Sequence, residues 1–96
     1  MPAYVLVEID VHDTERYETY KQLAPAAIEA YGGRYLARGG RCELLEGDRP
    51  PARLVILEFP DLETAGRWLE SPEYREARAL RHATATTRMV AVEGVP

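Results

Sequence analysis

The sequence predicts an α+β fold in which an antiparallel sheet carries its helices on one face, the split βαβ arrangement. Three observations predict it: segments in which apolar residues alternate as in a strand, segments in which they recur at helical spacing, and the order of these segments. That order is strand, helix, strand, strand, helix pair, strand. The 96 residues, of which 46% are hydrophobic, are sufficient for one domain over residues 1–96.

The chain opens with a strand and a long helix. The odd positions from residue 3 to residue 11 are all apolar, which predicts a strand with one buried face. Asp13 is placed to cap a helix that ends at Gly32. Pro25 removes the helical hydrogen bond to the carbonyl of Lys21, so we expect a bend there rather than a break. The apolar stripe that packs on the sheet consists of Tyr17, Tyr20, Ala24, Ala27, Ile28 and Tyr31.

A short strand, residues 34–38, lies between two glycine pairs. Gly32 can take the left-handed conformation that closes a helix, and we expect Gly39 or Gly40 to have a positive φ or to sit in a bulge. Residues 41–46 again have extended character, and residues 47–51 are rich in turn formers. We therefore expect a kinked strand followed by a hairpin loop.

The second half of the chain contributes two strands and a pair of helices. Residues 53–59 are almost continuously apolar, which is typical of an interior strand, and Glu58 is the exception. Asp61 is placed to cap a first short helix, and Ser71 with Pro72 to begin a second helix that runs to about Arg81. Residues 86–93 close the chain as a strand.

Helices on one side leave the other face of the sheet open. Leu6 and half of each remaining strand would expose apolar area there, so we expect a homodimer that stacks two such faces. A net charge of -4 with interspersed acids and bases argues against nucleic acid as a partner. Unbroken apolar runs such as residues 54–57 are far below the roughly 20 residues that span a bilayer, so we expect no membrane partner. Without a leader pattern, a cytoplasmic protein is expected.

Several short motifs are distinctive when they are taken together: Glu15-Arg16-Tyr17, the run from Gly32 to Gly40, Glu58-Phe59-Pro60, Trp68 to Ser71, Tyr74, Arg81 and Val92-Glu93-Gly94. Through them nearly the whole chain resembles the domain of unknown function family 1330, in the dimeric alpha-beta barrel superfamily. The resemblance implies a ferredoxin-like monomer and a sheet-to-sheet dimer. Related families include cofactor-independent monooxygenases, small-molecule isomerases and ligand-binding modules, so the resemblance selects no single activity.

Polar side chains on the strands and on the covering helices form the candidate ligand site. We expect Arg38 to join Glu58 or Arg81 on the concave side of the sheet, with Tyr74 and Tyr17 close by. An arginine, a tyrosine and a carboxylate together can orient an anionic or enolic ligand, with the carboxylate as base. The alternative is that these charges only pair with one another as structural ion pairs. No residue is assigned a catalytic role.

Two classes of function follow. His12 and His82 lack partners at helical spacing and Cys42 is the only cysteine, so we expect no metal site, no disulfide and no cofactor. One class is a small-molecule binder with a pocket between sheet and helices. Such a protein either binds its ligand alone or is also a cofactor-free enzyme with monooxygenase-like or isomerase-like chemistry. The other is a non-catalytic homodimer that acts as a scaffold or binds a partner. An open cavity that holds Arg38 favours the first class, and charges closed on one another favour the second.

Overall fold

The computed structural model describes residues 1–50 and 52–96 and has the expected order of elements. Its strands form a four-stranded antiparallel sheet in the order β2-β3-β1-β4. The apolar run of β3 therefore lies inside the sheet, as predicted. The strands are β1 (Ala3–Val11), β2 (Arg34–Arg38), β3 (Arg53–Phe59) and β4 (Ala85–Glu93).

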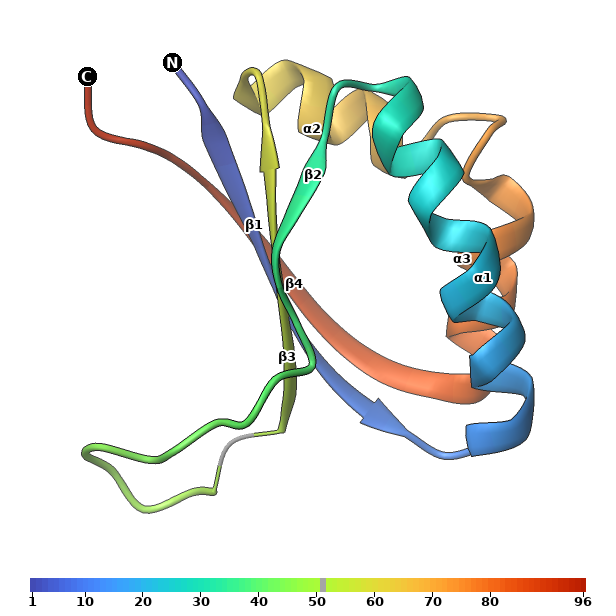
Figure 1. Cartoon of the computed structure of the whole chain (residues 1–96), viewed down its shortest axis with the longest axis vertical. Helices are drawn as coiled ribbons and strands as arrows, with labels where there is room; N and C mark the ends of the chain where they lie inside the picture. The colour runs from blue at the N-terminus through green and yellow to red at the C-terminus, as the bar shows by residue number, and fades with distance from the viewer. Residues whose placement is uncertain (51) are drawn as a thin grey trace.

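Three helices cover one face of this sheet, which confirms the predicted α+β arrangement (Figure 1). They are α1 (Thr14–Ala30), α2 (Leu62–Leu69) and α3 (Arg75–Thr84). The odd-numbered positions of β1 and β3 point into the core between the two layers, because alternate strand residues face the same side. A series of neighbouring aromatic rings continues the core from α2 to α1, with ring centroids 4.5 to 6.4 Å apart: Phe59, Trp68, Tyr74, Tyr20 and Tyr17.

The helix signals in the sequence act as predicted. The side chain of Asp13 accepts a hydrogen bond from the backbone N–H of Arg16 at 3.1 Å, and Asp61 caps α2 in the same way. Helix α1 continues through Pro25 without a break. Gly32 follows it with a φ of 72°, the left-handed conformation that ends a helix.

A bulge in β2 changes the side of the sheet that its last residues face. Arg34 and Tyr35 pair with Glu58 and Leu57 of β3, but the register then shifts by one residue, so that Arg38 pairs with Val55. In a regular strand, residues 34 and 38 would share one face. Because of the extra residue, Arg38 instead faces the helices with Tyr35, while Arg34 faces the open side.

Two expectations about local structure are wrong. Residues 41–46 form no strand: Gly39 has a φ of 67°, its N–H makes the last bond to β3, and the chain then leaves the sheet as a loop. The positive φ at Gly39 was itself predicted and is confirmed. Of the predicted turn at 47–51, Pro51 lies outside the described residues. Helix α3 begins at Arg75 rather than at Pro72, because Ser71 first closes a turn through its bond from the N–H of Tyr74.

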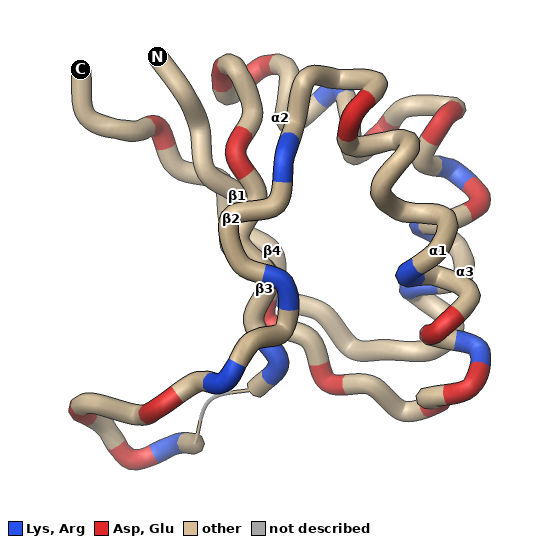
Figure 2. Tube along the Cα trace, in the orientation of Figure 1, with Lys and Arg blue, Asp and Glu red and all other residues tan. Residues whose placement is uncertain are grey.

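The face of the sheet opposite the helices carries an apolar patch. Leu6 lies between Ile56 of β3 and Val90 of β4 in register, and Leu6 and Val90 are 38% and 41% exposed. The loop after β2 and both termini extend on this side (Figure 1). Acidic and basic residues are interspersed over the chain (Figure 2). Among the described residues, no helix combines the length and apolarity needed to cross a bilayer.

Candidate functional site

A narrow cavity lies between α1 and the helix-facing side of the sheet. Its volume of about 20 Å³ is close to the space that one water molecule occupies. Aromatic and aliphatic side chains from both layers form its walls, and Trp68 of α2 closes its inner end. The wall residues are Val7, Ile9, Tyr17, Tyr20, Ile28, Tyr35, Val55, Leu57, Trp68 and Met89.

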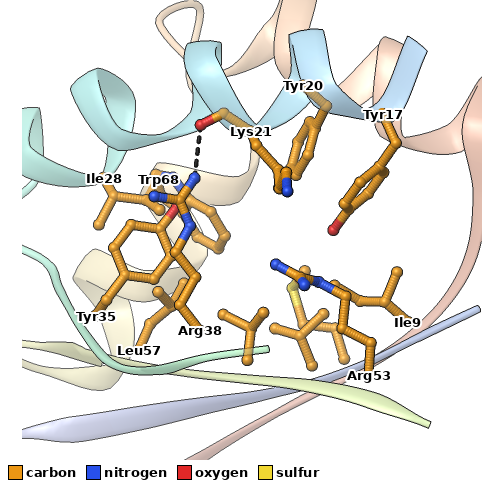
Figure 3. A pocket seen from close by; sticks show the side chains of 13 residues that line it. Ile9, Tyr17, Tyr20, Lys21, Ile28, Tyr35, Arg38, Arg53, Leu57 and Trp68 are labelled. Atoms are coloured by element: carbon orange, nitrogen blue, oxygen red, sulfur yellow. Dashed lines mark hydrogen bonds between the residues drawn. The ribbon is translucent and has the colours of Figure 1, made fainter. Parts of the chain in front are cut away.

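Three cationic side chains line the same cavity: Lys21 from α1, Arg38 from the end of β2 and Arg53 from the start of β3. Their charged groups point into one space beneath α1, and the hydroxyl of Tyr17 points toward it from the helix (Figure 3). The same three residues, with Glu18 and Gln22, also line an adjoining surface depression of about 380 Å³. The cations therefore stand where an apolar interior meets an open, polar depression.

Arg38 spans the opening between β2 and α1. Its guanidinium donates a hydrogen bond to the backbone carbonyl of Lys21 at 2.6 Å (Figure 3). This carbonyl is available because its helical partner would be the N–H of residue 25, and Pro25 has none. The guanidinium also lies 4.5 Å from the ring centroid of Tyr35, in cation–π geometry. The contact between Arg38 and Lys21 is called the latch below.

The side chain of Arg53 packs over the backbone of Gly39. Its guanidinium packs against Gly39 so closely that a Cβ at that position would overlap it. The guanidinium lies 5.7 Å from the ring centroid of Tyr17, and its Nε is buried without a hydrogen-bond partner among the described residues. No carboxylate of the described chain lies within ion-pair distance of Arg38 or Arg53.

A buried hydrogen-bond network of Arg81, Tyr74 and Tyr20 lies behind the cavity wall. Arg81 Nε donates to the hydroxyl of Tyr74 at 3.2 Å, and the Tyr74 and Tyr20 hydroxyls are 2.6 Å apart. Burial, reinforced by the neighbouring Tyr74, raises the pKa of Tyr20 above its ordinary value. Burial also raises the pKa of Tyr35, although the charge of Arg38 opposes this. Both phenols therefore stay protonated near neutral pH and can donate hydrogen bonds.

The structure separates the five candidate residues that the sequence indicated. Tyr17 and Arg38 line the cavity, whereas Tyr74 and Arg81 lie behind its wall and bond to each other. Glu58 is on the opposite face of the sheet, where Arg34 contacts it at 2.8 Å. The expected cluster of Arg38 with Glu58 is thus wrong, because the β2 bulge places them on different faces. That these five residues bind a ligand stays a prediction.

Among the polar residues of the lining, sequence reasoning missed three: Lys21, Tyr35 and Arg53. A signal for Arg53 was present, because it is two residues before Val55 and so faces the core side of β3. Lys21 and Tyr35 could not be found in this way. The position of Tyr35 relative to Arg38 depends on the bulge, and Lys21 is a polar residue next to the apolar stripe of α1.

Comparison with models of protein families identifies the family of the chain. The model of the domain of unknown function DUF1330 matches residues 2–95. The chain belongs to the DUF1330 family. A comparison with curated proteins gives no match.

Solved structures of similar fold agree with the ferredoxin-like architecture of this DUF1330 protein. RPA0582 of Rhodopseudomonas palustris, a protein of unknown function, has a TM-score of 0.80 at 21% identity, over 99% of this chain and 83% of that one. A dimeric ferredoxin-like protein of unknown function from Jannaschia sp. CCS1 has a TM-score of 0.72 at 15% identity, over 98% and 100%. The cofactor-independent oxygenase SnoaB of Streptomyces nogalater has a TM-score of 0.70 at 14% identity, over 99% and 94%. At these identities the likeness is one of fold.

The latch predicts an energetic coupling between Pro25 and Arg38. In the parent protein, we expect Arg38→Ala to lower the free energy of unfolding by about 1 kcal/mol, because the Lys21 carbonyl loses its donor. In a Pro25→Ala background the new N–H of residue 25 serves that carbonyl, so the same change should cost about 0.5 kcal/mol less. Urea unfolding of the four proteins in this double-mutant cycle measures the coupling. Arg16→Ala, at the start of the same helix, is the control and should be additive with Pro25→Ala; additivity for Arg38→Ala as well would contradict the latch.

The buried hydrogen-bond network predicts that loss of the Tyr74 hydroxyl lowers stability more than loss of the Tyr31 hydroxyl. Tyr74→Phe removes the acceptor of Arg81 and the partner of Tyr20, both in or near the core, and we expect it to lower the free energy of unfolding by about 2 kcal/mol. Tyr31→Phe removes a hydroxyl that donates to Glu73 at the surface, and should cost less than about 0.5 kcal/mol. Thermal unfolding of both variants compares the two changes. Equal losses would mean that the Tyr74 hydroxyl has no special role.

Proposed function

We propose that this protein binds a small, mainly aromatic or apolar molecule in the cavity between α1 and the sheet, and that it does so as a homodimer. The observation that carries the proposal is the composition of the cavity: aromatic and aliphatic walls, with the polar groups concentrated at one end. Small-molecule sites combine apolar walls with a few positioned polar groups in this way. The volume of about 20 Å³ corresponds to a closed form, and a ligand enters when the latch opens.

Cofactor-free chemistry is a second candidate function. The ionisable groups of the lining are tyrosines, a lysine and arginines. All of them can donate hydrogen bonds, and the lysine and the arginines carry positive charge. Such groups stabilise a negative oxygen, as in an enolate, that forms on a bound molecule. SnoaB is a cofactor-independent oxygenase, so this fold is known to accommodate chemistry without a cofactor. Binding precedes any such reaction and is the function proposed first.

The dimer is proposed from the open face of the sheet. Leu6, Val90 and Val92 are 38% to 50% exposed on the side that no helix covers. Contiguous apolar area of this kind is normally covered by a partner, and a second copy offers a matching face. The structures from Jannaschia sp. CCS1 and from Bacteroides fragilis, which have similar folds, are described as dimeric ferredoxin-like proteins.

The cavity predicts binding of a neutral aromatic probe. We expect benzamide to bind saturably and to change the fluorescence of Trp68, the only tryptophan of the chain. Val55→Ile adds a methylene group to the cavity wall and should weaken binding by about tenfold, because the added group occupies space that the probe needs once the latch is open. Val90→Ile makes the same change on the open face and is the control. If neither benzamide nor its charged analogue benzoate binds while the protein remains dimeric, the scaffold function is supported instead.

The open face predicts the effect of a charge at its centre. Leu6 and Leu62 are 38% and 40% exposed, on the open face and on α2 respectively. We expect Leu6→Lys to shift the protein from dimer to monomer, because the charge would have to be buried between the two sheets. Leu62→Lys should leave the dimer intact. Light scattering at micromolar concentration measures both, and a monomer mass for the parent protein would refute the homodimer.

A further inference from the structure

Two guanidinium groups in the cavity opening have no anionic partner. Arg34 and Arg78 each contact a glutamate, at 2.8 and 3.1 Å, whereas Arg38 and Arg53 have no carboxylate within ion-pair distance in the described chain. Each of the latter two is instead close to a tyrosine ring. Aromatic faces hold a guanidinium in place without using its N–H donors. These donors therefore remain available to a molecule that enters the opening.

The present acceptor of Arg38 is one that a ligand can replace. The Lys21 carbonyl is neutral, and it accepts from Arg38 because Pro25 leaves it without its helical partner. A carboxylate is a stronger acceptor for a guanidinium than a carbonyl, and it can accept two parallel hydrogen bonds from the planar fork. Exchanging the carbonyl for a carboxylate would also free the path between β2 and α1, because the latch spans it (Figure 3).

We propose that the ligand is an aromatic or apolar monocarboxylate, whose carboxylate displaces the Lys21 carbonyl from Arg38 and also binds Arg53. Its apolar body then occupies the cavity against Trp68. The inference rests on the proposed binding function and specifies the charge and orientation of the ligand. The ammonium of Lys21 is already paired with Glu18 at 2.9 Å, which leaves the guanidinium groups of Arg38 and Arg53 to bind the ligand. One carboxylate has two oxygens and can accept hydrogen bonds from both groups.

Gly39 is a positioning residue for this site. The guanidinium of Arg53 packs directly over it, in space that a Cβ would fill, and its φ of 67° is one that residues with side chains rarely adopt. Gly39 therefore sets the height of Arg53 above the sheet. Gly39→Ala should displace Arg53 while leaving its charge in the protein.

The test compares benzoate with benzamide, which have similar shape and differ in charge. We expect benzoate to bind about tenfold or more tightly than benzamide, because hydrogen bonds from a charged donor to a charged acceptor contribute more than those to a neutral one. Calorimetry gives the two affinities, and the fluorescence of Trp68 reports whether the ring reaches the inner end of the cavity. Equal affinities would overturn the carboxylate inference and leave the binding function standing. If neither compound binds, the binding function fails and this inference fails with it.

Variants identify the residues that cause the preference for benzoate over benzamide. Arg38→Gln and Arg53→Gln should each reduce the preference for benzoate over benzamide to about threefold or less. Arg34→Gln removes a paired arginine from the opposite face of the same β2 strand and should leave the preference unchanged. Gly39→Ala should lower the preference as Arg53→Gln does, although no charge is lost. Circular dichroism establishes that each variant is folded. A preference that survives both arginine changes, or that falls equally in Arg34→Gln, would overturn the proposal.

Discussion

A single extra residue in β2 determines how this protein uses its sheet. The bulge between Tyr35 and Ala37 lets Arg34 face the open side of the sheet while Arg38, four residues later, faces the helices. Arg34 can then pair with Glu58, and Arg38 can reach α1. In a regular strand both arginines would lie on the open face, and the cavity beneath α1 would lose one of its three cations.

The second constraint comes from a helix that cannot complete its own hydrogen bonds. Pro25 leaves the carbonyl of Lys21 without a partner, and Arg38 supplies one from the facing strand. Helix and sheet are thus joined at the surface by one charge-assisted bond that a better acceptor can replace. Arg53 lies in the same opening, placed there by the close approach that Gly39 permits. The cavity has room for about one water molecule, and Arg38, which spans its opening, is bound only to a neutral carbonyl.

The two faces of the sheet differ in composition. The helix-facing side carries the aromatic rings, the cavity and the unpaired guanidinium groups, whereas the open side carries Leu6, Val90 and the paired Arg34 and Glu58. On the open side Arg34 is paired with Glu58, and the apolar area there is what a second copy would cover. On the helix-facing side, the guanidinium groups of Arg38 and Arg53 pack against tyrosine rings, and the proposed ligand would supply their anionic partner. The same strands can therefore support assembly on one side and binding on the other.

The sequence by itself determined the fold, the capped starts of α1 and α2 and the glycine at which β2 ends, because alternation, capping residues and glycine conformations are local properties. It also indicated that the Lys21 carbonyl would lack its partner, since Pro25 alone decides this. Only the tertiary structure decided that Arg38 is the group that binds this carbonyl and that Glu58 belongs to the other face. Both facts depend on the register of β2 against β3, and a shift of one residue changes every partner beyond it without any local mark in the sequence.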